Sequence, residues 1–532
     1  MNIDKKFIKE LETLIITSYE KSKKLEKNIR KKELNDIVTD IDIFMENKII
    51  AKIKENFPEH SIYSEEKGEV VGNSEYVWFI DPIDGTINFS TEIPLFSTSI
   101  ALKKNDETVF GFIYDYSNNT SYYAIKGKGA YCNNKRIHVS DKTELSESII
   151  SFCLTSHYNI EKINDVLEVE KCLASKVRGL RLIVSTAIEL AWCAEGKIDG
   201  CLNVKASAGI SSAAGKLLVT EAGGTVTNIQ GNERQKIDTM LVSNGKIHSK
   251  LVNAMKYALF IGNTTEVIEI NNNSFCSNNI YLAGKAYSQA IAGAKSGLNC
   301  KLMTVVSGLN KSELDNLIIE AKKCNIDTSY IMVSNNIAND IKIVFRDENG
   351  KKIHEEDILN GTANAITEKL ICENENVIKK SAYVICQSKI DKKVIEKLAE
   401  ICNKNDIPII FTPSRPKAIS IINDINNKGL IDRFTMIICD ENELNEIFGN
   451  IEKKDDILKQ YSKRLILITN KEGIKYYDGI KINKIYADNY DKILKVGMKD
   501  VFIGNFVKIL IEKEELNVAI KDALEVIAKF ID

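Results

Sequence analysis

The hydrophobic pattern of this chain weakens once, between residues 260 and 279, and the segments on either side differ in character. Runs of Gly, Thr and Asn interrupt the pattern there, as at Asn271-Asn272-Asn273. The chain has 532 residues, whereas a single hydrophobic core seldom serves more than about 250–300 residues. We therefore expect two domains, residues 1–258 and 281–532, with a junction at 259–280.

Composition and charge exclude several classes of protein. The chain is 44% hydrophobic and 27% charged, which is typical of globular proteins and argues against disorder. Lys and Arg number 72 against 74 Asp and Glu, so no net basic charge favours nucleic acid or an anionic membrane as a partner. We find no run of about 18 apolar residues and no C-x-x-C pair among the twelve cysteines. We expect a cytoplasmic protein with neither a membrane span nor a structural zinc site.

The periodicity of the first half predicts a mixed sheet covered by helices. Apolar residues recur at three- and four-residue spacing in residues 4–25 and 43–56, which indicates amphipathic helices. An Ala- and Leu-rich helix is expected at 211–222, ending at two glycines. Short apolar runs separated by Asn, Asp and Gly predict strands at 76–80, 99–102, 108–114 and 121–125.

In the second half, segments with helix and strand character alternate, which favours an α/β layer with a largely parallel sheet. The expected helices are 288–296, 312–324, 392–403 and 500–511. The expected strands are 301–306, 342–345, 382–386, 407–411, 436–439 and 465–469.

The densest chemistry lies at Asp81-Pro82-Ile83-Asp84-Gly85-Thr86, directly after an apolar strand. Proline stiffens the turn, so that Asp81 and Asp84 can face one point. The N–H groups of Gly85 and Thr86 would receive a phosphate if they open a helix. Carboxylates beside a phosphate require cations between them, and hard oxygen ligands select Mg²⁺. The alternative is a surface turn, because Asp, Pro and Gly are common turn formers.

Two further acidic clusters favour the metal site over the turn. Glu65 and Glu66 follow one apolar stretch, and Asp36, Asp40 and Asp42 alternate with apolar residues before it. Three acidic clusters at the edges of apolar runs are typical of a site for phosphoryl transfer with several metal ions.

These residues resemble the inositol monophosphatase superfamily, which includes fructose 1,6-bisphosphatases, over about residues 5–258. The D-P-[IL]-D-G-T-x-N-F element matches at every position from Asp81 to Phe89. The D-x-V-T-x-x-D element matches from Asp36 to Asp42, the E-E pair at Glu65, and E-A-G-G from Glu221. A G-x-G-A-[FY] turn matches at Gly127–Tyr131.

The resemblance implies a role for each matched residue. Two or three Mg²⁺ ions would be held by Glu65, Asp81, Asp84 and the carbonyl of Ile83, and Li⁺ would inhibit. The catalytic group would be Asp42, Glu65 and Thr86, with Asp42 and Thr86 orienting the attacking water. The phosphate would contact Gly85, Thr86 and Ser185. The resemblance further implies a homodimer acting on a small phosphorylated polyol or sugar.

Two positions depart from this family. The aspartate expected ten residues before Glu221, which completes a second metal site, is Ser211 here. Loss of that charge would weaken the second metal and the stabilisation of the leaving group. The family glycine before Ser185 is Val184.

From Tyr281 the chain resembles the ribokinase-like carbohydrate kinases, with partial matches. Residues 283–292 track G-G-K-G-A-N-Q-A-V-A, and residues 497–504 track G-A-G-D-x-F-x-G. By that resemblance Asp500 would be the catalytic base, but Lys499 replaces the glycine whose backbone supports the transferred phosphate. We expect a degenerate kinase domain.

We therefore expect a layered α-β-α-β-α sugar-phosphatase fold followed by a ribokinase-like α/β domain. The expected function is Mg²⁺-dependent hydrolysis of a phosphomonoester of the inositol 1-phosphate or fructose 1,6-bisphosphate class. One alternative is a catalytically impaired regulator or scaffold that binds a sugar phosphate or a nucleotide. The other is sugar kinase activity in the second half.

Overall fold

The computed structural model divides the chain into two compact units, Met1–Met255 and Lys256–Asp532. It describes residues 3–24, 29–31, 37–154, 159–203, 209–232, 239–271, 279–309, 311–347, 352–358, 361–413, 430–448, 453–462, 464–486, 490 and 497–529.

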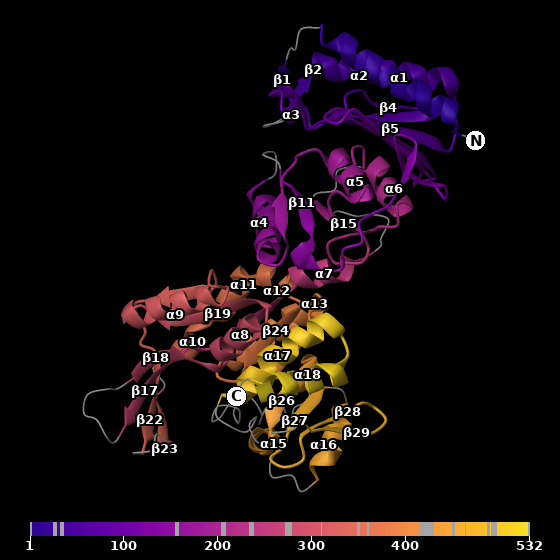
Figure 1. Ribbon diagram of the computed structural model, residues 1–532. Helices are drawn as coiled ribbons and strands as arrows, with labels where there is room; N and C mark the ends of the chain where they lie inside the picture. Colours follow the sequence, from indigo (N-terminus) through magenta and orange to yellow (C-terminus); the bar gives the residue numbers. More distant parts are fainter. Residues whose placement is uncertain are drawn as a thin grey trace. The chain divides into compact units, whose positions relative to one another are not determined.

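The first unit is built on an eight-stranded sheet that is antiparallel except at one pair of strands (Figure 1). Its order is β10-β9-β8-β7-β6-β5-β3-β4. The strands are β3 (Ser61–Ser64), β4 (Gly68–Val70), β5 (Tyr76–Asp84), β6 (Ser97–Lys104), β7 (Glu107–Asp115), β8 (Thr120–Ile125), β9 (Gly129–Cys132) and β10 (Lys135–Ile137).

Helices α1 (Lys5–Ser22) and α2 (Asp40–Asn56) cover one face of this sheet (Figure 1). Asp4 begins α1 by accepting a hydrogen bond from the Phe7 N–H at 2.8 Å. A stripe of α1 that includes Leu11 and Ile15 packs with Trp78 and Ile80 of β5. A two-stranded ribbon, β1 (Ile29–Lys31) and β2 (Ile37–Thr39), precedes α2.

Helices α5 (Thr186–Ala194) and α6 (Ala213–Glu221) form the middle layer, against the other face of the sheet. Glycines permit the close approach, because a Cβ on Gly111 of β7 would lie 2.8 Å from Cα of Ala214. A Cβ on Gly215 would lie 2.4 Å from Cβ of Leu190, so α5 and α6 also pack closely on each other.

A five-stranded sheet, β12-β11-β13-β15-β14, lies beyond α5 and α6, and α4 and α7 cover its far face. The first unit therefore has the expected α-β-α-β-α layers. These elements are β11 (Ile149–Cys153), β12 (Gly179–Arg181), β13 (Gly200–Asn203), β14 (Thr225–Thr227), β15 (Met240–Ser243), α4 (Ile160–Ala174) and α7 (His248–Met255). The short helix α3 (Thr86–Ser90) follows β5.

The second unit contains a ten-stranded sheet whose strands from β20 to β27 are all parallel, with an antiparallel pair, β28 and β29, at one edge. Its order is β20-β19-β16-β24-β25-β26-β27-β28-β29, and β21 also pairs with β19. The strands are β16 (Tyr257–Ile261), β19 (Asn299–Ser307), β20 (Ile326–Asp327), β21 (Ile331–Ser334), β24 (Tyr383–Gln387), β25 (Ile409–Thr412), β26 (Met436–Asp440), β27 (Leu465–Ile468), β28 (Ile474–Tyr477) and β29 (Ile482–Ile485).

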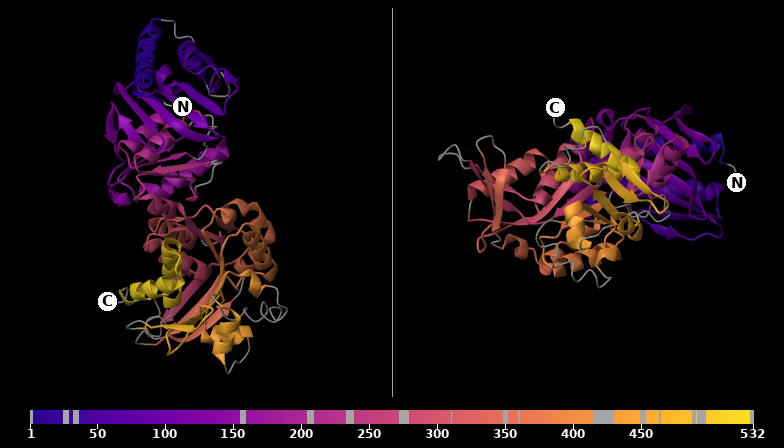
Figure 2. Two further views of the ribbon diagram at one scale, coloured as in Figure 1. Left: turned by 90° about the vertical axis from the view of Figure 1, so that its right-hand side faces the viewer. Right: turned by 90° about the horizontal axis from the view of Figure 1, so that it is seen from below.

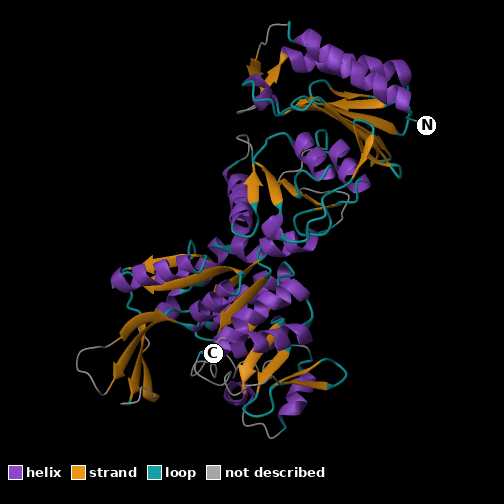
Figure 3. Cartoon of the chain, viewed as in Figure 1, coloured by secondary structure: helices purple, strands orange, loops and turns teal. Residues whose placement is uncertain are grey.

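Helices cover both faces of this sheet, as expected for a ribokinase-like α/β unit (Figure 3). One face packs against α8 (Lys285–Lys295), α9 (Lys311–Lys323), α17 (Met498–Lys513) and α18 (Leu516–Lys529), the last two drawn in yellow in Figure 2. The other face packs against α11 (Glu368–Glu373), α12 (Glu375–Lys379), α13 (Lys392–Lys404), α15 (Glu441–Phe448) and α16 (Lys454–Gln460).

A separate four-stranded sheet of the second unit has the order β18-β17-β22-β23. Its strands are β17 (Thr265–Asn271), β18 (Asn279–Ala283), β22 (Asp340–Arg346) and β23 (Lys352–Ile358), and α10 (Thr362–Ala365) follows. The segment expected as a junction, 259–280, instead supplies the end of β16, all of β17 and the start of β18. The Asn-rich run at its centre made the neighbouring strands hard to recognise.

Across the described part of the chain, we find no helix with the length and hydrophobicity that crossing a membrane requires.

Candidate functional site

The site in the first unit starts from a bulge in β5. Asp81 pairs with Ser99 and Asp84 with Ser97, so three steps along β5 match two along β6. In a regular strand, residues three apart face opposite sides, but the extra residue of the bulge turns both aspartates to one side. That side faces α5 and α6.

Glu65 reaches the same point from the end of the neighbouring strand β3. Its N–H donates to the carbonyl of Ile80 at 3.1 Å, which fixes the chain beside Asp81. The pKa of Asp81 is raised by burial, by Glu65 and by Asp84. The structure therefore brings together three carboxyl groups that the sequence singled out.

Asp84 is held firmly by the start of α5. Its Oδ2 accepts hydrogen bonds from the Ser185 hydroxyl at 2.6 Å and from the Ala187 N–H at 2.8 Å. Burial raises the pKa of Asp84 to about 6, although these donors act in the opposite direction. Ser185 therefore holds an aspartate, and a direct contact with phosphate stays a prediction.

Asp42 lies in the first turn of α2, where it and Thr39 cap each other. The Thr39 N–H donates to Oδ2 of Asp42 at 2.8 Å, and the Thr39 hydroxyl contacts the same oxygen. Burial and, to a smaller extent, the charge of Glu65 raise the pKa of Asp42 to about 6. Asp42 therefore lies close enough to the carboxyl group of Glu65 for the two charges to interact. Asp36, from the same motif, lies outside the described residues.

Gly85 and Thr86 make the turn from β5 into α3. Gly85 has a φ of 90°, and a Cβ there would lie 2.9 Å from the carbonyl oxygen of Leu95, so both conformation and space require glycine. The Thr86 hydroxyl donates to the carbonyl of Ile83 at 3.0 Å. Because α3 has only five residues, its dipole adds little to a phosphate site at this turn.

Val184 has a φ of 59°. A β-branched side chain is strained in this left-handed region, which glycine adopts readily. The carbonyl oxygen of Val184 would lie 3.3 Å from a Cβ on Gly85, so the strained residue borders the turn that carries the site.

Sequence reasoning missed Glu46, a fully buried carboxylate of α2. Its Oε1 accepts the N–H groups of Glu66 at 3.0 Å and Lys67 at 3.2 Å, which holds the turn that carries Glu65. The available signal was its position four residues after Asp42, on the same helix face.

Glu189 of α5 was also missed. It is fully buried and accepts a hydrogen bond from the Ser151 hydroxyl at 2.6 Å. Burial raises its pKa to about 7, and the charge of Asp84 contributes. No local motif marks this residue in the sequence.

The donor set at Asp81 fits a hard divalent cation. Glu65, Asp81 and Asp84 interact unfavourably as charges, and the buried Oδ1 of Asp81 has no hydrogen-bond partner. A cation would relieve both features. Within the described residues, no group of three or more His, Cys, Asp and Glu side chains already has an arrangement that could hold a metal. Metal ligation by these residues is therefore a proposal.

Ser211 lies beside these carboxyl groups, where the family aspartate was expected. Its side chain lowers the pKa of Asp81, and its carbonyl accepts a hydrogen bond from the Ser99 hydroxyl at 3.2 Å. The backbone at residue 211 therefore lies beside the carboxyl groups, where the family aspartate was expected, but the side chain there is neutral.

The other two matched motifs have a structural role, because they are hydrogen-bonded to each other. Both oxygens of Glu221 accept backbone N–H groups, from Gly127 at 2.7 Å and Gly129 at 2.8 Å. The E-A-G-G and G-x-G-A-[FY] elements therefore hold each other.

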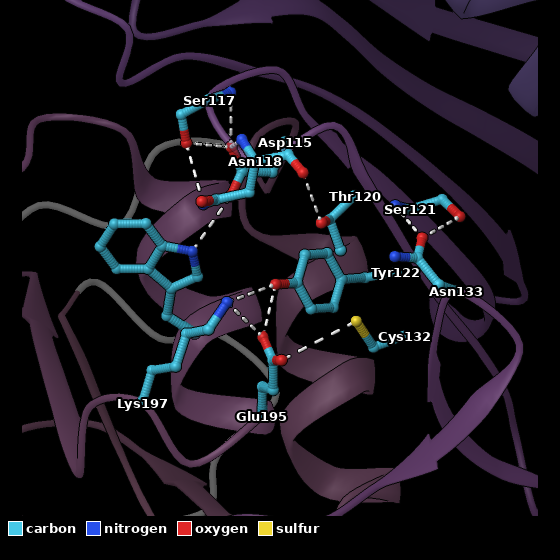
Figure 4. A network of polar contacts seen from close by, with 11 residues as sticks. Asp115, Ser117, Asn118, Thr120, Ser121, Tyr122, Cys132, Asn133, Glu195 and Lys197 are labelled. Carbon is cyan, nitrogen blue, oxygen red and sulfur yellow. Dashed lines mark hydrogen bonds and ion pairs between the residues drawn. The ribbon is translucent and has the colours of Figure 1, made fainter.

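A polar network anchors the C-terminal end of α5, whose N-terminal end holds Asp84 (Figure 4). Glu195 accepts a hydrogen bond from the Tyr122 hydroxyl at 2.6 Å and pairs with Lys197 at 2.8 Å. Asp115 accepts one from the Trp192 indole at 3.1 Å. These internal bonds fix α5 to the eight-stranded sheet.

In the second unit, Asp500 lies in the first turn of α17. Its Oδ1 accepts a hydrogen bond from the Gln289 amide at 2.9 Å, and burial raises its pKa. The preceding residue, Lys499, forms an ion pair with the buried Glu443. Lys285 also pairs with Glu443, at 3.2 Å. An internal ion network therefore surrounds the candidate base.

The structure thus defines two α/β units, one with a cluster of carboxyl groups and one with a mainly parallel sheet. Residues 1–259 match the model of the inositol monophosphatase family, and residues 257–526 match that of the pfkB family of carbohydrate kinases. The chain belongs to the inositol monophosphatase family through its first half and to the pfkB carbohydrate kinase family through its second.

Relatives of the first half carry different names. The inositol-1-monophosphatase of Bacillus subtilis is 36% identical over 253 residues, which are 47% of this chain and 93% of that protein. The Nus factor SuhB of Haemophilus influenzae is 31% identical over 49% of this chain and 96% of that protein. The fructose-1,6-bisphosphatase/inositol-1-monophosphatase of Thermotoga maritima is 34% identical over 42% of this chain and 85% of that protein.

Proposed function

We propose that the first unit hydrolyses a phosphomonoester of a small polyol or sugar with the help of Mg²⁺. The observation that carries this proposal is the convergence of Glu65, Asp81 and Asp84, with one buried oxygen of Asp81 left without a donor. Family membership of this half supports the reaction class. Inositol 1-phosphate and fructose 1,6-bisphosphate represent the expected substrate class.

Two or three Mg²⁺ ions would be held by Glu65, Asp81, Asp84 and the Ile83 carbonyl, with Li⁺ as an inhibitor. Bound Mg²⁺ would supply a Lewis acid that polarises the phosphoryl oxygens and makes water a better nucleophile. Ser185 and the start of α5 hold Asp84, so that its carboxylate keeps one orientation.

Asp42 and Thr86 would orient the attacking water. Asp42 is fixed by its bonds from Thr39, and Thr86 by its bond to Ile83, so each has a defined position before substrate arrives. Gly85 lets the backbone approach the phosphate closely.

Phosphate release from inositol 1-phosphate and from fructose 1,6-bisphosphate, measured across a Mg²⁺ series, tests this proposal. We expect Mg²⁺-dependent release that Asp81→Asn lowers by about 100-fold or more, because one metal ligand loses its charge. A matched control is Asp141→Asn, an exposed aspartate of the same unit. Equal activity of Asp81→Asn and the wild type would refute the assignment.

For the second unit we propose ligand binding without phosphoryl transfer. Lys499 stands where the family glycine would present its backbone, and its ammonium group pairs with Glu443. The amide of Gln387, at the carboxyl end of β24, is 1% exposed, and neither its nitrogen nor its oxygen has a hydrogen-bond partner. Ligands of open α/β sheets bind at these strand ends, and an orphaned amide suits a hydroxyl-rich ligand.

The full chain should therefore show no ATP-dependent phosphorylation of ribose, fructose, fructose 6-phosphate or adenosine. Turnover that disappears with Asp500→Asn would refute this and would establish a working sugar kinase. Ligand binding without release or transfer of phosphate in either half would instead support the regulator or scaffold.

A further inference from the structure

Two lysines of the first unit interact electrostatically where α6 packs against the eight-stranded sheet: Lys103 lies on β6 and Lys216 on α6. Lys103 alternates with Ser99 and Ala101, which face α6. The Nζ atom of Lys103 lies 4.2 Å from the ring centroid of Phe79 and 3.6 Å from the place that a Cβ on Gly209 would take. Lys103 therefore reaches the turn that leads into α6.

Neither lysine has an acidic side chain within ion-pair distance among the described residues. Asp106 attracts Lys103 electrostatically, but without an ion pair within 4.0 Å. By contrast the next residue, Lys104, pairs with Glu75 at 2.9 Å on the opposite face. The two positively charged ammonium groups therefore repel each other, and no acidic side chain among the described residues forms an ion pair with either of them.

Partial burial makes this arrangement unfavourable. Burial lowers the pKa of both lysines, and the charge of Lys103 contributes to lowering that of Lys216 to about 8. Two half-buried cations without a counter-charge would be stabilised by an anion that contacts both.

Lys103 lies close to the carboxyl groups. Phe79, under the Lys103 ammonium, precedes Asp81 by two residues on the same strand face, a separation of about 7 Å. Gly209 precedes Ser211 by two residues, and the Ser211 side chain lies close enough to Asp81 to lower the pKa of that carboxyl group. A six-carbon sugar or polyol can bridge a gap of this size. The neutral Ser211 leaves no carboxylate at that position to repel an anion in between.

We propose that Lys103 and Lys216 bind a second phosphate of the substrate, one that is not hydrolysed. The preferred substrate is then a sugar or polyol with two phosphates, and the lysine pair determines that preference. Lysine acts on phosphate as a compact charge, so two ammonium groups neutralise the dianion. This inference rests on the proposed phosphatase function and adds its substrate class.

The first test measures binding without catalysis. Calorimetry in EDTA, which removes Mg²⁺, compares fructose 1,6-bisphosphate with inositol 1-phosphate and inorganic phosphate. We expect the bisphosphate to bind the wild type at least tenfold more tightly than the double variant Lys103→Met, Lys216→Met. Lys104→Met is the matched control and should bind as the wild type does. The Arg pair at the same positions keeps the charge and should retain most of the affinity.

The second test measures turnover with Mg²⁺. The double Met variant should raise KM for fructose 1,6-bisphosphate about tenfold, with kcat/KM for inositol 1-phosphate within twofold of the wild type. If binding in EDTA depends on the lysines but no substrate releases phosphate, the proposed phosphatase activity is refuted, whereas the lysine site is supported. Unchanged bisphosphate binding in the Met variant would overturn the site. Binding of inorganic phosphate as tight as that of the bisphosphate would also overturn the site.

Discussion

The two aspartates of the β5 bulge differ in how much the protein itself neutralises them. Asp84 accepts hydrogen bonds from Ser185 and Ala187, whereas Asp81 keeps a buried oxygen without a donor. Asp81 therefore depends more on a bound cation than Asp84 does. The chain at Ser211 adds only a hydroxyl on the Asp81 side of the site.

Ser211→Asp should strengthen metal binding, because it restores a carboxylate beside Asp81. We expect the Mg²⁺ concentration for half-maximal phosphate release to fall about tenfold, equivalent to about 1.4 kcal/mol of metal-binding free energy. Ser211→Asn, which adds bulk without charge, is the control. If both variants need as much Mg²⁺ as the wild type, the position does not contribute to a metal site.

Val184→Gly should stabilise the first unit. A non-glycine residue in the left-handed region costs about 1–2 kcal/mol, and the greater flexibility of glycine in the unfolded chain offsets part of the gain. We expect the free energy of unfolding to rise by about 1 kcal/mol. Both tryptophans, Trp78 and Trp192, lie in the first unit, so their fluorescence in a urea titration reports on this unit. Val184→Ala, which keeps the strain, should show little gain.

At the scale of elements, the site depends on how α2 holds the turn after β3. The first turn of α2 presents Asp42, and the next turn places Glu46 under the N–H groups of Glu66 and Lys67. One helix therefore positions both the water-orienting candidate and the turn that carries Glu65.

Glu46→Ala should loosen that turn. Two partly buried N–H groups would lose their acceptor, which we expect to cost about 1–3 kcal/mol of stability in the first unit, followed by tryptophan fluorescence. Phosphatase activity should fall by at least tenfold because Glu65 loses its position. Glu46→Gln keeps the acceptor oxygen and should retain more of both properties. Equal loss in the two variants would show that the charge, rather than the hydrogen bonds, is needed.

The elements around the site could be predicted because their periodicity is strong. The helix expected at 43–56 is found as α2, and the strand expected at 76–80 is found within β5. The bulge could not be predicted, because it depends on pairing with β6 rather than on local sequence. The role of Glu189 could not be predicted either, because its hydrogen-bond partner Ser151 lies on β11, a strand far from α5 in the sequence.

At the scale of the whole molecule, buried carboxyl groups make the stability of the first unit depend on pH. The pKa of Glu189 is raised from 4.5 to about 7 and that of Asp42 from 3.8 to about 6. The native state therefore binds these protons more tightly than the unfolded chain does. The stabilisation is complete below about pH 4 and is lost as the pH rises through 6 and 7.

Without Mg²⁺, we expect the free energy of unfolding of the first unit to fall between pH 5 and pH 8 by a few kcal/mol, on the scale of about 1.4 kcal/mol per pKa unit. Added Mg²⁺ should restore stability at pH 8, because it binds the ionised carboxylates of the native state. Urea titrations monitored by tryptophan fluorescence measure both the fall in stability with pH and its recovery with Mg²⁺. Glu189→Gln should flatten the dependence above pH 6, and an unchanged slope in that variant would exclude Glu189 as its source.

The placement of β16 limits how the chain can be cut. This strand starts two residues after α7 ends, yet it is an interior strand of the second sheet, paired with β19 on one side and β24 on the other. A gene fragment that begins at residue 281 would leave a gap between those strands and two rows of backbone groups without partners. Such a fragment would aggregate or recruit a substitute strand. Studies of the kinase-like half in isolation therefore require a start point no later than Lys256.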